Sequence, residues 1–110
     1  MNVSIVVYHV KDLASAKPLF AALTGTEPYV ENPYYIGFRS NNLEIGLAPA
    51  GYNGLSGPVP YWTADDIREA VKKLVESGAT LQQDVTDIGG GGLIAVLRDP
   101  EGNAIGLRSF

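Results

Sequence analysis

His9 is the only histidine of the chain, and it lies near the end of a run rich in β-branched residues. Imidazole changes its charge near neutral pH, so His9 is a candidate general base or hydrogen-bond donor. Glu44, between Leu43 and Ile45, is the second candidate catalytic residue, because a carboxylate on an enclosed apolar face can act as an acid or a base. Each has an ordinary alternative: His9 bonded to backbone or water at a strand end, and Glu44 solvated or paired with Arg39.

Several aromatic side chains would suit a site for a flat ligand. They are Tyr34, Tyr35, Phe38 and Tyr61, although alternation along a strand lets only some of them point the same way. The alternative is ordinary sheet core or a contact between subunits. Trp62 is expected in the core, packed on the second helix.

The run Gly89–Gly92 has a permissive backbone that suits either a mobile loop over a site or a plain hairpin connection. It is not a P-loop, because no Lys-Ser/Thr follows it and no helix begins there. The chain has no cysteine, which excludes disulfides and cysteine-ligated metal sites. It also has no nucleophile elbow, no paired His-Glu helix motif and no dinucleotide-binding fingerprint.

Composition indicates one globular domain, with 45% hydrophobic and 18% charged residues in 110. The net charge is −4 and no Lys/Arg cluster is present, which argues against nucleic acid and anionic membranes as partners. No signal peptide precedes the first strand, and no apolar run approaches the ~20 residues of a membrane span. We therefore expect a cytoplasmic protein.

The second half of the chain repeats the first. Residues 6–20 match residues 60–74 at an offset of 54, and the sequence Ile-Gly-Leu occurs at both 45–47 and 105–107, at an offset of 60. The second half therefore carries about six extra residues between its helix and its last strand, placed mainly at the glycine run.

Each half is predicted to run strand, helix, then three strands. The first helix follows Asp12 and ends at Gly25, and Pro18 implies that it either begins at Ser15 or kinks. The second follows the capping-box spacing of residues 66 and 69 and ends at position 78. The strands are expected at residues 3–10, 28–30, 34–39, 43–48, 80–85, 93–98 and 104–109, with 51–57 as the linker.

These features resemble the vicinal-oxygen-chelate superfamily of glyoxalases, bleomycin-resistance proteins and extradiol dioxygenases. Residues 99–105, Asp-Pro-Glu-Gly-Asn-Ala-Ile, resemble its D-P-x-G-N-x-I signature. The strand-to-helix junctions at 10–13 and 64–67 resemble its V-x-D-L openings, and Gly78-Ala79 resembles the pair that ends its second helix. The match covers essentially the whole chain.

The resemblance implies an α+β fold in which two tandem βαβββ modules form a curved mixed sheet around a pocket. Residues 1–110 would form a single domain, with residues 1–51 as the first module and 58–110 as the second. It further implies a small-molecule ligand and a homodimer. Whether the modules pair within one chain or across two stays open.

In that family, metal ligands come from the first and fourth strands of each module. The matching positions here are Ile5 and Val59 on the first strands, and Gly106 and Gly46 on the fourth, or Glu44 if the register slips by two. Hydrocarbon and glycine supply none of the oxygen or nitrogen donors that a divalent cation needs. We therefore expect no metal bound in the usual way, no cofactor, and none of the chemistry in which an ion polarises vicinal oxygens.

Alternation along the strands then selects the side chains that would face the pocket. The expected ligand-binding residues are Ile5, Val7, His9, Glu44, Gly46, Val59, Tyr61, Thr63, Gly106 and Arg108. Three functions compete. The first is a metal-independent protein that binds an apolar or aromatic small molecule. The alternatives are a glyoxalase-related lyase or isomerase using His9 and Glu44 in acid–base work, and a residual metal site completed by these same two residues.

Overall fold

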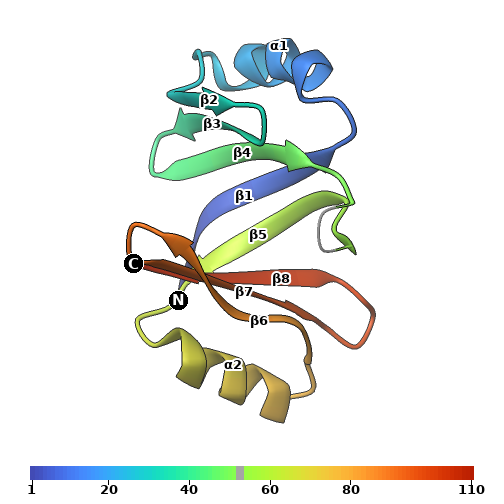
Figure 1. The fold of residues 1–110 in the computed structure, drawn as a ribbon, viewed down its shortest axis with the longest axis vertical. Coiled ribbons are helices and arrows are strands. Elements are labelled where there is room, and N and C mark those ends of the chain that lie inside the picture. Colours follow the sequence, from blue (N-terminus) through green and yellow to red (C-terminus); the bar gives the residue numbers. More distant parts are fainter. Residues whose placement is uncertain (52–53) are drawn as a thin grey trace. The chain divides into compact units, whose positions relative to one another are not determined.

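The computed structural model describes residues 1–51 and 54–110, so residues 52 and 53 of the predicted linker lie outside the described residues. The order of elements is the predicted βαβββ unit, twice (Figure 1). The elements are β1 (Asn2–Val10), α1 (Leu13–Thr24), β2 (Val30–Asn32), β3 (Tyr35–Ser40), β4 (Leu43–Pro49), β5 (Gly57–Thr63), α2 (Ile67–Glu76), β6 (Thr80–Gly89), β7 (Gly92–Arg98) and β8 (Ala104–Ser109). The α+β fold with two tandem modules is thereby confirmed.

Two compact units make up the chain. The N-terminal unit comprises Ser4–Val59, and the C-terminal unit comprises Pro60–Phe110 together with Met1–Val3. In the N-terminal unit the strand order is β2-β3-β4-β1. The pair β1–β4 is parallel, whereas β2–β3 and β3–β4 are antiparallel.

Helix α1 begins and ends as its sequence predicts. The carboxylate of Asp12 accepts hydrogen bonds from the Ala14 backbone N–H at 3.0 Å and the Ser15 hydroxyl at 2.6 Å. Gly25 ends the helix with φ of 74°, a left-handed conformation that costs glycine little. Because α1 starts at Leu13, the alternative start at Ser15 is wrong, and Pro18 lies inside the helix, where it removes a backbone donor.

The core of the N-terminal unit lies between α1 and its sheet. Phe20 of α1 packs against Ile36, Phe38 and Leu47 of β3 and β4, and the Tyr8 ring lies 4.9 Å from the Phe20 ring. Phe38 is fully buried in this core. Phe38 is therefore part of the core, as the alternative of ordinary sheet core predicts.

In the C-terminal unit the strand order is β5-β8-β7-β6, with β5–β8 parallel and the other pairs antiparallel. Helix α2 covers one face of this sheet (Figure 1). Its buried side chains Ile67, Ala70 and Val71 pack against Leu97 and Leu107. The Asp66 carboxylate caps α2 by accepting from the Glu69 backbone N–H at 3.1 Å, which confirms the predicted helix start.

Three local features differ from expectation. Strand β2 spans Val30–Asn32 rather than residues 28–30. Trp62 is 37% exposed, so its predicted place in the core is wrong, although its pairing opposite Leu107 puts it on the helix side of the sheet. Strand β6 extends to Gly89 rather than ending near residue 85, because Gly90 and Gly91 take φ of 61° and 81°. Two successive positive φ values form the turn that suits a twisted hairpin. The glycine run is thus a hairpin connection.

The Asp-Pro-Glu-Gly-Asn motif is a turn held by one carboxylate. Asp99 accepts hydrogen bonds from the backbone N–H groups of Glu101 and Asn103 at 3.0 and 2.8 Å, and from the Asn103 side chain at 2.8 Å. These bonds, led by the Asn103 side chain, lower the pKa of Asp99. Gly102 has φ of 90°. No helix in the described part of the chain has the length and apolarity to cross a bilayer.

Candidate ligand-binding site

Each sheet has one face that does not pack on the helix of its own unit, here called the helix-free face. In the N-terminal unit, the strand register pairs Ile5 with Glu44, Val7 with Gly46 and His9 with Ala48. Directly paired residues lie on the same face. The face expected for Ile5, Val7, His9, Glu44 and Gly46 is therefore the one on which the structure places them.

Glu44 is the polar centre of this face. Its two carboxylate oxygens accept hydrogen bonds from two different hydroxyls, Oε1 from Tyr29 and Oε2 from Tyr35. Arg39 lies directly opposite Glu44 in the β3–β4 register, and its guanidinium stacks 4.0 Å from the centre of the Tyr29 ring. Glu44 thus accepts hydrogen bonds from two tyrosine hydroxyls, and Arg39 is held against an aromatic face. Residues Tyr29, Tyr35, Arg39 and Glu44 are called the tyrosine–glutamate cluster below.

Two glycines make room for the rings of this cluster. A Cβ atom on Gly46 would lie 2.7 Å from Cε1 of Tyr35, and one on Gly37 would lie 3.0 Å from ring carbons of both Tyr29 and Tyr35. Gly37 and Gly46 are paired across β3 and β4. Because neither glycine has a side chain, the phenol rings can pack directly against the strand backbone at these two positions.

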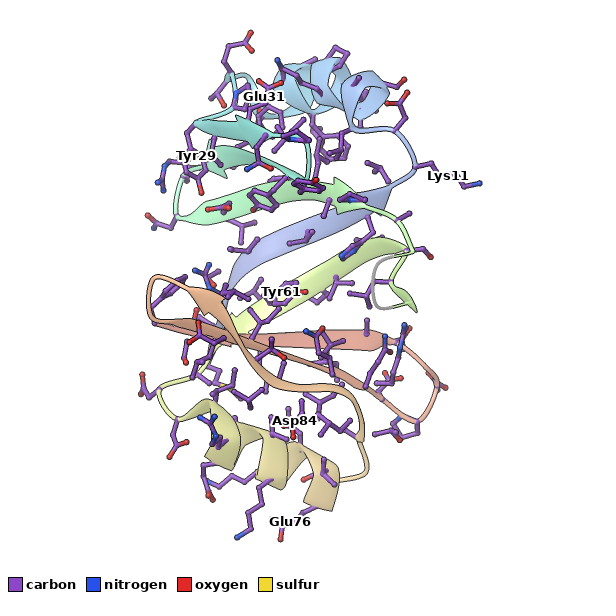
Figure 2. All side chains as sticks on the ribbon, in the orientation of Figure 1. Lys11, Tyr29, Glu31, Tyr61, Glu76 and Asp84 are labelled. Atoms are coloured by element: carbon purple, nitrogen blue, oxygen red, sulfur yellow. The ribbon has the colours of Figure 1, made fainter. Side chains whose placement is uncertain are left out.

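Tyr29 was not predicted as a site residue, and Tyr34 was an incorrect candidate for an inward-facing ring. Tyr29 precedes β2 and is labelled in Figure 2, whereas Tyr34 is 77% exposed in the turn before β3. The useful signal was the pair of glycines at 37 and 46, since a strand glycine often marks the close approach of another group.

His9 is buried, and its Nδ1 lies 3.1 Å from the backbone carbonyl oxygen of Gly57. A carbonyl oxygen only accepts, so Nδ1 carries the proton in this bond and Nε2 is left as the acceptor. Burial lowers the pKa of His9, against the opposing effect of the Gly57 hydrogen bond. The ring is consequently neutral at pH 7, in the form suited to a base.

The structure does not bring His9 and Glu44 together as a pair. Their register partners, Ala48 and Ile5, place them four positions apart along the paired strands. At about 3.3 Å per residue this separates their backbones by roughly 13 Å. The two groups therefore occupy opposite ends of the helix-free face.

The C-terminal unit has a similar arrangement on its helix-free face. Tyr61 pairs with Gly106, and Thr63 pairs with Arg108, so these predicted site residues share one face. A Cβ atom on Gly106 would lie 2.7 Å from Cγ of Tyr61, labelled in Figure 2. Burial raises the pKa of Tyr61. The guanidinium of Arg108 stacks 4.1 Å from the Phe110 ring.

The register decides which residue of the first module corresponds to Gly106. The pair Val7–Gly46 and the pair Tyr61–Gly106 are related by the offsets 54 and 60 of the sequence repeat. Gly46 is therefore the counterpart of Gly106, and Glu44 is the counterpart of Ala104. The four positions at which the resemblance implies metal ligands are then Ile5, Gly46, Val59 and Gly106.

These residues do not fit a divalent cation. None of the four has a donor side chain, and tyrosine rings occupy the space beside both glycines. Across residues 1–51 and 54–110, no three His, Cys, Asp or Glu side chains gather in a way that could hold a metal ion. Val59 is buried, and its side chain is hydrocarbon without a donor atom.

A depression of about 260 Å³ lies on the helix side of the C-terminal unit, at the start of α2. Asp65, Asp66, Glu69 and Lys73 are among its lining residues. It is separate from the helix-free faces, and none of the predicted site residues lines it.

Comparison with known proteins finds glyoxalase-like relatives. A family model described as a glyoxalase-like domain matches residues 59–107. Over 107 residues the chain is 28% identical to the provisionally named glyoxylase CFP32 of Mycobacterium bovis, and equally to that of Mycobacterium tuberculosis. The match covers 87% of this chain and 41% of each relative, so the chain spans less than half the length of these proteins.

Solved structures share the fold. A glyoxalase/bleomycin resistance protein/dioxygenase superfamily member from Vibrio splendidus 12B01 has a TM-score of 0.73 at 14% identity, covering 96% of this chain and 97% of the other. Methylmalonyl-CoA epimerase from Mycobacterium tuberculosis has a TM-score of 0.75 at 16% identity, covering 97% and 86%. The predicted resemblance to the vicinal-oxygen-chelate superfamily is confirmed by the glyoxalase-like match over residues 59–107 and by the shared fold.

Proposed function

We propose that the chain is a small-molecule-binding protein of the glyoxalase/bleomycin-resistance type that works without a bound metal. The observation that carries the proposal is the chemistry of positions 5, 46, 59 and 106, where Ile, Gly, Val and Gly offer no donor. Tyrosine rings lie where side chains of the two glycines would be. Binding energy would therefore come from the protein's own apolar and hydrogen-bonding groups.

The ligand proposed is apolar or aromatic. Ile5 and Val7 supply hydrocarbon on the helix-free face, and Tyr29 and Tyr35 supply rings that favour offset or edge-on packing with another ring. The Glu44 carboxylate can accept a further hydrogen bond from a donor on the ligand, since each oxygen has more than one acceptor site. Most small-molecule sites combine such apolar surface with a few polar groups that fix orientation.

A thermal-shift screen against aromatic metabolites and antibiotics, with and without a chelator, tests the proposal. Hits are then measured by titration calorimetry on Tyr35→Leu and on Tyr34→Leu, the matched control one residue away in the exposed turn. We expect chelator-independent binding that Tyr35→Leu weakens at least about tenfold, which is about 1.4 kcal/mol, and that Tyr34→Leu leaves unchanged. Binding that requires added metal, or that both variants weaken equally, would contradict it.

The second candidate is a lyase or isomerase of the superfamily, favoured by the buried, neutral His9 with its proton fixed on Nδ1. Here His9 would remove a proton through Nε2, and Glu44 would act at the other end of the face rather than as its partner. Turnover that survives chelation and is lost in both His9→Ala and Glu44→Gln would support this function. Activity retained in those variants would refute the assignment.

A further inference from the structure

The helix-free face of the C-terminal unit carries an arginine whose neighbours on that face are uncharged. Arg108 pairs with Thr63 of β5 on one side and with Ile94 of β7 on the other, and directly paired residues lie on the same face. Its guanidinium lies over the Phe110 ring. Tyr61 pairs with the next residue of β8 on this face, Gly106. The Arg108 cluster is defined as Tyr61, Thr63, Ile94, Arg108 and Phe110.

The charge of Arg108 is not balanced by a carboxylate of the protein. Arg108 is half-buried, and in the described part of the chain no acidic side chain forms an ion pair with it. Arg98 provides a contrast, because its guanidinium donates to the Gln82 side chain and, at 2.9 Å, to the carbonyl oxygen of Gly102. A guanidinium has five N–H donors, so Arg108 can bind an acceptor that comes from outside the chain.

The Phe110 ring restricts the position of this guanidinium. A Cβ atom on Gly92 would lie 2.9 Å from Cε1 of Phe110, so the ring packs against the backbone of β7 where a side chain is missing. The cation of Arg108 is attracted to the face of that ring. A guanidinium that is already held in place loses less conformational freedom when it binds a planar anion.

The first module shows that the strand pairing does not require this charge. By the repeat offsets of 54 and 60, Arg108 corresponds to Ala48. Ala48 pairs with β1 just as Arg108 pairs with β5. Because the same parallel pair forms with alanine at this position, the reason for the arginine lies outside the pairing of the strands.

We propose that the Arg108 cluster binds the carboxylate of a small molecule whose remaining part is apolar or aromatic. The proposal rests on the small-molecule-binding function proposed above and adds the charge of the ligand. A carboxylate matches the planar guanidinium and can accept two parallel hydrogen bonds from it. Ile94 and Tyr61 supply apolar surface beside the guanidinium for the rest of the ligand. A doubly charged phosphate fits less well, because a single arginine leaves one of its charges unbalanced in a chain of net charge −4.

Titration calorimetry with phenylacetate and phenylacetamide tests the proposal, because these probes differ only in the charged end. We expect the carboxylate to bind at least about tenfold more tightly than the amide, and Arg108→Gln to remove this preference. Arg108→Lys keeps the charge but not the planar donor group, so it should retain only part of the preference. The matched control, Arg68→Gln, removes the same charge from the exposed side of α2 and should leave the preference unchanged. Circular dichroism checks that all variants are folded.

Heteronuclear NMR gives an independent measurement of where the probe binds. The side-chain Nε–H signal of Arg108 should shift when phenylacetate is added, whereas that of Arg68 should not. Phenyl phosphate, used in place of phenylacetate, separates the two kinds of anion. Phenylacetate that fails to bind, equal binding of acid and amide, a preference that survives Arg108→Gln, or tighter binding of phenyl phosphate would each overturn the proposal. If an aromatic ligand binds without metal and Arg108→Gln has no effect on it, the proposed function stands and the role of Arg108 is refuted.

Discussion

At the scale of single residues, the helix-free face of the N-terminal unit depends on a glycine. Gly46 is buried, and the Tyr35 ring rests on it with no space for a side chain. Tyr35 in turn donates to Glu44. The position of the carboxylate therefore follows from the absence of a methyl group two residues along the same strand.

Gly46→Ala should consequently destabilise the protein by about 1–3 kcal/mol, the usual cost of overpacking. Chemical denaturation measures the change. The same substitution in a Tyr35→Ala background should cost much less, because the clash is removed, and Tyr35→Ala alone gives the remaining corner of the cycle. Equal costs in both backgrounds would show that the ring does not set the requirement for glycine.

The buried His9 ring makes stability depend on pH. Its pKa is lowered in the folded state, by burial, relative to about 6.5 in the unfolded chain. The unfolded state then binds the proton more readily, so the contribution is complete above about pH 6.5 and is lost as pH falls through the lowered value. Comparing the free energy of unfolding of wild type and His9→Gln from pH 7.5 to 5 (approximate limits) isolates this effect. We expect the wild type to lose more stability than the variant, and parallel curves would contradict it.

At the scale of elements, both helices begin at an aspartate whose carboxylate caps the helix, but the residues beside that aspartate differ. Asp66 caps α2 by accepting from the Glu69 backbone N–H. Asp65 precedes it with the same side chain but no such role in the helix cap. The pair therefore separates the hydrogen bond of the cap from the general effect of a carboxylate near a helix start.

Asp66→Ala should lower the free energy of unfolding by about 1 kcal/mol, as loss of an N-cap does. Asp65→Ala should change it by less than about 0.5 kcal/mol, as an ordinary surface substitution. Thermal and chemical denaturation of both variants measure the difference. If the two variants lost equal stability, the cap would not be the cause.

Strand register was predictable from the sequence where each face had a different chemistry. Alternation predicted that Ile5, Val7 and His9 share one face of β1 and that Glu44 and Gly46 share the matching face of β4, which agrees with the pairing of these strands. The rest depended on contacts between distant residues. The periodicity of the sequence does not indicate that Tyr29, outside β2, contacts Glu44. It also does not indicate that Trp62 is partly exposed.

At the scale of the whole molecule, the fold was predictable because duplication, turn motifs and order agreed along the entire chain. The site was less predictable than the fold, because it depends on side-chain contacts between distant residues. Its ligand-binding residues remain a prediction. The proposed metal-independent function makes one global prediction: exhaustive dialysis against a chelator leaves the melting temperature and far-ultraviolet dichroism unchanged. A fall in melting temperature that zinc, nickel or manganese reverses would contradict it.

The lone tryptophan gives the molecule a built-in optical label. Trp62 belongs to the C-terminal unit and is partly exposed to water, while no indole is present in residues 4–59. When the indole is excited selectively, its emission therefore reports changes around β5. It does not report changes elsewhere directly. A fluorescence trace that disagrees with a dichroism trace during denaturation would accordingly show the two halves of this duplicated chain melting at different points.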